Sequence, residues 1–354
     1  MLRTAAYRRH IENLIRDDNG ALPKLGQVAH SSSRRVYSSA GRRRRTALAR
    51  MAVAAALLAL ALVWTGIGDQ GLGADDHVQW STGSGKALHL AWPGEGQAAV
   101  AVEGVGTLGV SGDETPVPIA SVAKAMTAYL VLKDYPLEPG EEGFAIEIGP
   151  ADVEYLRRRI ALDQSVVEVE AGEVLSERQA LDALLLPSAN NVAALLAAHA
   201  AGSVEAFVEE MNEAAAELVM DETHYTDPSG YEDSTVSTAA DQLKLARAAM
   251  ADPVFAEIVA MPATVLPVAG EVANYNGLVG REGFVGIKTG SHEAAGGCLL
   301  FAKRIGAGGR TLTVLGAVLG QRDGDLVEAA LDAARKLGAS VAGAVRGQAG
   351  ALQQ

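Results

Sequence analysis

The chain has 354 residues, of which 49% are hydrophobic and 5% aromatic, and it carries a net charge of −13 at neutral pH. This length allows one large domain or two small ones, and the composition supports an ordinary globular core. A single cysteine, Cys298, excludes an internal disulfide framework and a metal site built from a cysteine cluster. Cys298 lies in an apolar run and is predicted to be a small core residue.

The charge is divided unevenly along the chain. Residues 1–50 contain 12 lysines and arginines against 3 acidic residues, and the remainder is strongly acidic. Residues 51–67 carry no charge and are long enough for a membrane span, which needs about 17–25 apolar residues. Arginines precede this run, and Trp64 lies near its far end, where interfacial aromatic residues are found. The pattern predicts a transmembrane signal anchor at 51–67 and a protein of the cell membrane that crosses it once. Residues 1–50 would form a disordered cytoplasmic tail, and everything after the anchor would be extracellular.

Two alternatives to an anchor remain. A cleaved signal peptide has an apolar region of about 7–15 residues followed by a small-residue cleavage site, whereas this run is longer and no clear site follows it. A core helix is the other alternative, which the adjoining arginines fit poorly. The basic tail has no binding motif with interleaved aromatic residues, so no nucleic-acid partner is predicted.

Residues 68–85 are rich in glycine, aspartate and serine and are predicted to be a linker. Part of it resembles a phosphate-binding loop, but the first glycine is absent and Ala87 replaces the residue that would hold magnesium, so nucleotide binding is rejected.

The folded part begins near residue 86. Short apolar segments at 98–102 and 106–110 predict a β-hairpin, and the apolar run after Pro118 predicts a helix that begins near Ser121. The remaining periodic segments, in chain order, are short strands at 141–148 and 166–170, helices at 176–186, 191–199, 204–218 and 238–252, strands at 283–289, 297–302 and 311–319, and an amphipathic helix at 328–337.

This order of strands, helices and strands predicts an α/β fold of the α+β type. The first and last strands would form one antiparallel sheet flanked by helices, with an all-helical subregion inserted between them. We expect the folded domain to span 86–340 and residues 341–354 to form a flexible tail.

Ser121 and Lys124 are three residues apart, so on a helix their side chains share a face. Their neighbours are alanine, valine and methionine, and polar groups in such surroundings need a reason. One reason is nucleophilic catalysis, in which Ser121 attacks and Lys124 takes its proton. The alternative is a serine cap beside an exposed lysine.

Two further stretches carry polar groups at turns or strand ends. Ser188 and Asn190 follow Pro187, where a helix ends, and could offer a hydroxyl and an amide to one cleft; the alternative is an ordinary helix N-cap. Lys288 and Gly290 share one face of a strand. The lysine would supply a cation for a carboxylate, and the missing side chain of Gly290 would let a substrate backbone approach, unless the lysine is simply exposed.

Taken together, Ser-x-x-Lys, Ser-x-Asn and Lys-Thr-Gly form a recorded signature of penicillin-binding proteins and serine β-lactamases. The surrounding sequence resembles the D-alanyl-D-alanine carboxypeptidase family of low-molecular-mass penicillin-binding proteins, serine peptidase family S11, over about residues 88–338. The stretches that carry this resemblance are 118–130, 186–191, 211–218, 223–230 and 237–241.

The resemblance implies a β-lactamase/transpeptidase-like fold and a serine-type D-alanyl-D-alanine carboxypeptidase. Its substrate would be the peptidoglycan stem pentapeptide, from which it removes the terminal D-alanine, and β-lactam antibiotics would be its covalent inhibitors. It implies no cofactor and no metal. The motifs are compatible with carboxypeptidase trimming and with endopeptidase cleavage of cross-links.

The resemblance also implies roles for single residues. Ser121 would be the acyl-enzyme nucleophile and Lys124 its general base, Ser188 would relay a proton to the leaving D-alanine, and Asn190 would bind the substrate backbone. In the binding segment, Lys288 and Thr289 would hold the terminal carboxylate, beside Gly290 and Ser291. Backbone N–H groups of Ser121 and Ser291 would form the oxyanion hole.

For Lys124 to act as a base at neutral pH, its pKa must fall by about three units from about 10.4, which requires burial and a nearby cation. Lys288 is the candidate for that cation.

The sequence departs from the family pattern at four positions. Ala189 and Asn191 replace the commoner glycine and aspartate of the middle motif, and Ser291 precedes His292 where histidine and threonine are usual. Arg322 is a further candidate partner for a carboxylate, although an exposed arginine is the simpler interpretation.

Two alternative functions use the same scaffold. A class A-like β-lactamase would carry Ser-Asp-Asn and a glutamate that activates water, and neither is found at the usual spacing. A non-catalytic cell-wall-binding protein would have lost Ser121 or Lys124, and both are present.

Overall fold

The computed structural model of the protein describes residues 89–351. The predicted basic tail, the anchor at 51–67 and the linker at 68–85 lie outside the described residues. Within the described range, no single helix is both long enough and apolar enough to cross a membrane. Helices α6 (Asn190–Ala201) and α7 (Val204–Glu217) meet these criteria only as a pair, which is bent by 83°.

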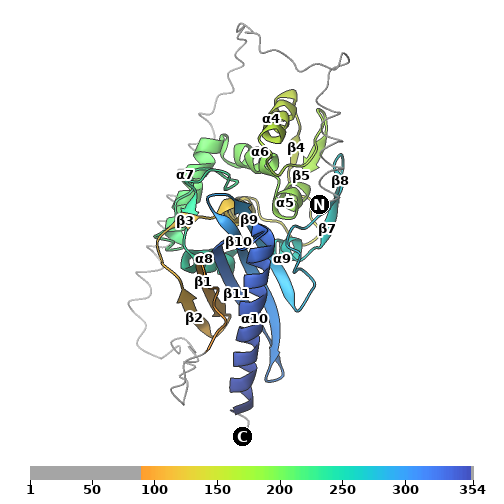
Figure 1. Cartoon of the computed structure of the whole chain (residues 1–354). Helices are drawn as coiled ribbons and strands as arrows, with labels where there is room; N and C mark the ends of the chain where they lie inside the picture. Colours follow the sequence, from red (N-terminus) through yellow and green to blue (C-terminus); the bar gives the residue numbers. More distant parts are fainter. Residues whose placement is uncertain (1–88, 352–354) are drawn as a thin grey trace, which may run out of the picture. The chain divides into compact units, whose positions relative to one another are not determined.

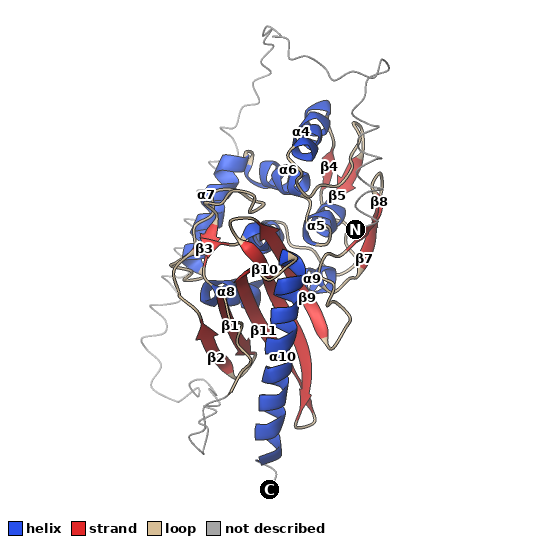
Figure 2. Cartoon of the chain, in the orientation of Figure 1, coloured by secondary structure: helices blue, strands red, loops and turns tan. Residues whose placement is uncertain are grey.

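The centre of the fold is a five-stranded antiparallel sheet with the strand order β2-β1-β11-β10-β9, which joins the first and last strands as predicted (Figure 2). The predicted hairpin and the last three predicted strands are all present, and the last three are longer than expected. Their bounds are Gln97–Val102 for β1, Gly106–Ser111 for β2, Phe284–His292 for β9, Gly296–Ala307 for β10 and Arg310–Gln321 for β11.

Each face of the sheet is covered by helices. Val100, Phe301 and Val318 pack with residues of α10 (Leu326–Ala351), which crosses one face of the sheet (Figure 1). Alternate residues of the same strands, such as Leu300 and Ala317, belong to the second core cluster, which includes α8 (Ala239–Met250) and the inserted helices. This alternation is the period of two that a sheet buried on both faces requires.

The expected flexible tail at 341–354 is wrong over most of its length, because α10 continues to Ala351. Val341 and Ala342 are buried, and Arg346 Nε donates to the carbonyl oxygen of Gly306 at 3.1 Å. The last part of α10 therefore packs beside the end of the β10–β11 hairpin.

The inserted region is mainly helical but also contains three pairs of short strands, so it is not the all-helical subregion that was predicted. In chain order it contains the 3₁₀ helix η1 (Ala120–Ala123), α3 (Lys124–Asp134), α4 (Pro150–Ala161), α5 (Glu177–Leu185), α6, α7, α8 and α9 (Pro253–Val259), with the short strand pairs β3 (Val117–Pro118) with β6 (Val236–Ser237), β4 (Ala145–Glu147) with β5 (Val174–Ser176), and β7 (Ala263–Leu266) with β8 (Gly270–Ala273).

Helix starts in this region follow the local sequence. Ser176 Oγ accepts a hydrogen bond from Gln179 N and Gln179 Oε1 accepts one from Ser176 N, which is a capping box at the residue where the helix of α5 was predicted to begin. Helix α4 was not predicted, although Pro150 at its first position and Asp152 two residues later mark its start. Asp152 Oδ2 accepts from Gly149 N at 2.9 Å.

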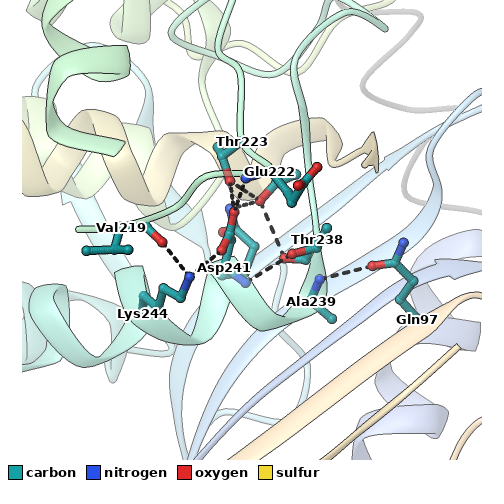
Figure 3. Close-up of polar contacts among 10 residues, drawn as sticks. Gln97, Val219, Glu222, Thr223, Thr238, Ala239, Asp241 and Lys244 are labelled. Atoms are coloured by element: carbon teal, nitrogen blue, oxygen red, sulfur yellow. Dashed lines mark hydrogen bonds and ion pairs between the residues drawn. The ribbon is translucent and has the colours of Figure 1, made fainter. Parts of the chain in front are cut away.

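The start of α8 is fixed by a polar network that ties it to the sheet (Figure 3). Thr238 Oγ1 accepts from Asp241 N at 3.1 Å, and Asp241 in turn accepts from Thr223 Oγ1 and pairs with Lys244. Gln97 Oε1 on β1 accepts from Ala239 N at 3.1 Å. These bonds satisfy N–H groups that a helix start leaves without intrahelical partners.

The strand predicted at 166–170 is wrong. Val167 and Val169 are buried, which explains the alternation, but the segment pairs with no strand. Instead the side chain of Asn191 accepts from Val167 N at 3.1 Å and donates to the Val167 carbonyl oxygen at 3.0 Å. The Asn191 side chain therefore makes the two backbone hydrogen bonds that a neighbouring strand would make, and the segment lies against the start of α6.

Candidate active site

Ser121 lies in the 3₁₀ helix η1, and α3 begins at Lys124, so the predicted helix starts as a tighter turn. Ala120, immediately before the serine, has φ 48°, a left-handed conformation that costs a residue with a side chain about 1–3 kcal/mol. Gly230 packs directly on this residue: a Cβ at Gly230 would lie 1.8 Å from the Ala120 carbonyl oxygen. The turn that presents Ser121 is therefore held by its surroundings.

Ser121 and Lys124 are paired directly. Lys124 Nζ lies 2.7 Å from Ser121 Oγ and donates to the Ser229 carbonyl oxygen at 2.8 Å. The lysine side chain is completely buried. Of the two interpretations of this motif, the structure excludes a serine cap beside an exposed lysine.

The surroundings of Lys124 disfavour its charged form. Burial lowers the pKa of Lys124 well below its usual value, the positive charge of Lys288 lowers it further, and the Asp227 carboxylate opposes both effects. The predicted influence of Lys288 is present, but burial is the larger cause. A lysine whose pKa is lowered in this way is more readily neutral, and a neutral lysine can accept a proton as a general base.

Lys288 is a second buried lysine and comes from β9. Its Nζ donates to the Thr289 carbonyl oxygen at 3.0 Å, and burial lowers its pKa to about 7. No ion pair of Lys288 is found among the described residues, so its ammonium group has no carboxylate partner of its own there. This charge is available to a carboxylate ligand.

Gly290 brings β9 against the serine turn. A Cβ at Gly290 would lie 2.8 Å from Ser121 N and 2.9 Å from Val122 N, closer than real contacts allow. The missing side chain therefore lets the strand and the turn touch, a contact that was not predicted, and the approach of a substrate backbone at Gly290 stays a prediction. Ser291, the next residue, is exposed and lies beside this contact.

Ser188 and Asn190 flank the start of α6. Ser188 is buried in a left-handed conformation with φ 65°, and its Oγ makes no hydrogen bond within the described part of the chain. Asn190, the first residue of α6, donates from Nδ2 to Gln164 Oε1 at 2.9 Å and lines a cavity together with Ser229. Because Ser229 also contacts Lys124, the middle motif lies next to the Ser121–Lys124 pair.

The candidate residues at the rim take different positions. Thr289 is buried beside Lys288, whereas His292 is half-buried, with its Nδ1 3.4 Å from Asp233 Oδ1. Arg322 is exposed, as expected, and donates to the carbonyl oxygens of Glu293 and Ala294 in the turn after β9. Among the described residues, no group of three or more His, Cys, Asp or Glu side chains is placed to hold a metal ion.

The sequence-based prediction assigned no role to the turn at 227–230. Asp227 accepts hydrogen bonds from Ser229 N, Ser229 Oγ, Tyr231 N and Thr235 Oγ1, and these bonds fix the loop that offers the Ser229 carbonyl to Lys124. The Asp-Pro-Ser-Gly stretch has the composition of a turn, and that was the available signal. Its partner is a lysine more than a hundred residues earlier, which no local pattern reveals.

Asn191 provides a test of how the 164–170 segment is held. Replacing Asn191 by alanine is expected to lower the free energy of unfolding by about 1–3 kcal/mol, because the Val167 backbone loses both partners in a buried position. Urea unfolding measures this loss. Asn212 makes the same pair of bonds with the backbone of Tyr225, so Asn212→Ala should cost a similar amount. An Asn191→Ala variant as stable as the wild type would contradict the bracing role.

The antiparallel sheet with helices on both faces is the fold of penicillin-binding proteins and DD-transpeptidases. The crystal structure of the Streptomyces K15 DD-transpeptidase superposes with a TM-score of 0.60 at 28% identity, covering 69% of this chain and 95% of that one. A penicillin-binding protein homologue from Mycobacterium tuberculosis superposes with a TM-score of 0.59 at 31% identity, covering 73% and 94%.

The chain belongs to the D-alanyl-D-alanine carboxypeptidase family, whose sequence model matches residues 98–319. The D-alanyl-D-alanine carboxypeptidase DacB2 of Mycobacterium tuberculosis is 41% identical over 155 residues, which cover 42% of this chain and 52% of that protein. A D-alanyl-D-alanine endopeptidase of Escherichia coli is 32% identical over 195 residues, which cover 52% and 58%. The chain thus spans a little over half the length of these two relatives.

Proposed function

We propose that this protein is a serine-type D-alanyl-D-alanine carboxypeptidase that removes the terminal D-alanine of peptidoglycan stem pentapeptides through an acyl-enzyme on Ser121. The observation that carries the proposal is the buried Lys124, with Nζ 2.7 Å from Ser121 Oγ and a pKa lowered by burial and by Lys288. Membership of the family and the names of the relatives support the substrate.

Acylation begins with neutral Lys124. Its Nζ takes the proton of Ser121 Oγ as the oxygen attacks the carbonyl carbon of the penultimate D-alanine. The negative oxygen that develops is stabilised by the backbone N–H groups of Ser121 and Ser291. The peptide bond then breaks, and the leaving D-alanine nitrogen receives a proton through Ser188 Oγ, whose lack of a hydrogen-bond partner among the described residues leaves it able to act as a relay.

Substrate binding and deacylation use the remaining groups. Lys288 and Thr289 hold the terminal carboxylate, and Asn190 binds the peptide backbone. After D-alanine leaves, water attacks the ester carbon and gives its proton to Lys124, and the shortened peptide is released as the proton returns to Ser121 Oγ. A β-lactam follows the same first step, but its ring-opened product stays attached and blocks the water.

The contact at Asn190 favours a carboxypeptidase over a class A-like β-lactamase. The side chain that reaches Asn190 from the 164–170 segment is the uncharged Gln164. A class A enzyme uses a glutamate to activate the deacylating water. An amide cannot take that proton, so the penicilloyl ester on Ser121 would turn over slowly.

The same proposal includes the location of the protein. Residues 51–67 anchor it in the cell membrane as a single pass, the N-terminus is cytoplasmic, and the catalytic domain from about residue 86 is extracellular and faces the peptidoglycan. The support is the uncharged run with arginines before it. Protease added to spheroplasts would remove the penicillin-labelled domain, whereas protection of that domain would contradict this orientation.

The test of the proposed activity is labelling of the full chain with a fluorescent penicillin, together with D-alanine release from a synthetic pentapeptide. We expect the wild type to be labelled and to release D-alanine, and we expect Ser121→Ala to do neither. Ser291→Ala is the matched serine control, since its proposed contribution comes from the backbone. An unlabelled wild type would indicate a non-catalytic wall-binding protein, and rapid turnover of the drug would indicate a β-lactamase.

A further inference from the structure

A cavity of about 120 Å³ adjoins the candidate active site on the side of α4. Its lining includes Arg159 of α4, Gln164, Asn190 and the turn at 227–232. Asn190 and Ser229 belong both to this cavity and to the surroundings of Lys124, whereas none of residues 288–291 lines it. The cavity therefore extends the site away from the group that would hold the terminal carboxylate.

Three of the residues that line this cavity each carry a polar atom without a hydrogen-bond partner among the described residues. Arg159 Nε, Gln164 Nε2 and Asn190 Oδ1 are all buried and form no hydrogen bond with any other described residue. Folded proteins satisfy most buried polar atoms, so three such atoms around one cavity point to a ligand. Two of them are donors and one is an acceptor, which suits a ligand with a backbone N–H near Asn190 and an oxygen acceptor near Arg159 and Gln164.

Arg159 differs from the two arginines before it. Arg157 and Arg158 are exposed, and Arg157 Nη1 and Arg158 Nε each lie 3.7 Å from a carboxylate oxygen of Glu154. The guanidinium group of Arg159 instead lies over the ring of Tyr155, 4.3 Å from its centroid, and Arg159 forms no ion pair within the described range. Arginine presents a planar fork of donors that matches a carboxylate, so the stacked and oriented Arg159 has the form of a carboxylate receptor.

The acidic residues of the cavity do not neutralise this cation. The Asp227 carboxylate accepts hydrogen bonds from Ser229, Tyr231 and Thr235 within its own turn. Glu232 is exposed at the rim. A ligand that carried an ammonium group beside its carboxylate would find a partner for each, Glu232 for the ammonium group and Arg159 for the carboxylate.

We propose that this cavity binds the side chain of the stem-peptide residue that precedes D-alanyl-D-alanine, and that Arg159 selects a side chain ending in a carboxylate. The inference rests on the proposed function. With the scissile carbonyl at Ser121 and the terminal carboxylate at Lys288, the rest of the peptide runs past Asn190 toward the cavity. Gln164 also positions Asn190 through the bond to its Nδ2.

Three pentapeptides that differ only in their third residue test the proposal. The third residue is diaminopimelate, its side-chain carboxamide, or lysine, so the series removes first the charge and then the whole group. For the wild type we expect kcat/KM for D-alanine release to be about tenfold or more higher with the carboxylate than with the other two, as for a hydrogen bond to a charged group.

The variant Arg159→Gln should reduce this ratio to about one, and Arg159→Lys should retain part of it. Arg158→Gln is the matched control, because it removes an exposed arginine from the same helix and should keep the wild-type ratio. Thermal unfolding of each variant verifies that it is folded.

Equal kcat/KM values for the three peptides with the wild type would overturn the proposal. So would an Arg159→Gln variant that slows all three peptides by the same factor, since that is the effect of a merely structural residue. Failure of the proposed function looks different: no peptide releases D-alanine and penicillin does not label Ser121, and both proposals then fall together.

Discussion

Replacing Lys124 by methionine is expected to slow the acylation of Ser121 by a penicillin about 10³-fold, as the loss of a general base does. Methionine has a similar length and fills the same buried space, but it cannot take the proton of Ser121 Oγ, 2.7 Å away in the wild type. Stopped-flow measurement of fluorescent penicillin binding gives the rate. Lys133→Met is the control, because it changes an exposed lysine of the same helix.

The stability of this variant separates lost chemistry from lost folding. Burial lowers the pKa of Lys124, so at neutral pH the unfolded chain binds more protons than the folded chain, and the wild-type lysine destabilises the fold there. This destabilisation diminishes as the pH rises toward the unfolded pKa of about 10.4. Methionine removes it, while the Ser229 carbonyl loses a donor. We expect urea unfolding of Lys124→Met to depend less on pH between about 7 and 10 than that of the wild type. A variant acylated at the wild-type rate would exclude Lys124 as the base.

The parts of the site that could be predicted from sequence are those in which a residue acts through local geometry. Ser121 and Lys124 are three apart, and that spacing alone places their side chains together. The starts of α5 and α8 are local for the same reason, and Ser176 and Thr238 cap these helices at the residues where they were predicted to begin. The antiparallel sheet was also predictable, because its central strands are apolar runs that are buried on both faces.

Contacts between side chains and distant backbone could not be predicted in this way. The Ser229 carbonyl accepts a hydrogen bond from Lys124 across more than a hundred residues. Every residue has a backbone carbonyl group, so the type of side chain at position 229 does not reveal this contact. The segment at 166–170 had the alternation of a strand, but Asn191 satisfies the Val167 backbone and no strand does. At Gly290 the sequence indicated a close approach, and the structure shows that the approaching group is the backbone of Ser121.

Lys288 is expected to affect both the acid and the alkaline limb of the pH profile of kcat/KM for D-alanine release. Peptide hydrolysis needs neutral Lys124 and charged Lys288 together, so kcat/KM should follow a bell whose alkaline limb reports the Lys288 pKa of about 7 in the free enzyme. A bound carboxylate stabilises the ammonium group and raises that pKa, so the alkaline limb of kcat should lie at higher pH than that of kcat/KM. Initial rates of D-alanine release between about pH 4 and 10 give both profiles.

Replacing Lys288 by glutamine should change this profile in three ways. The alkaline limb disappears because the titrating group is gone, and kcat/KM falls about 10²-fold at its optimum because the substrate carboxylate loses its charged partner. The acid limb moves to higher pH, because the positive charge of Lys288 lowers the pKa of Lys124 in the wild type and its removal lets that pKa rise. Lys303→Gln is the matched control: Lys303 is also buried in the sheet, but it donates to the Glu282 carbonyl and stacks on Phe284, away from Ser121. An acid limb that stays at the same pH in Lys288→Gln would show that burial alone sets the basicity of Lys124, and Lys288 would then act only on the substrate.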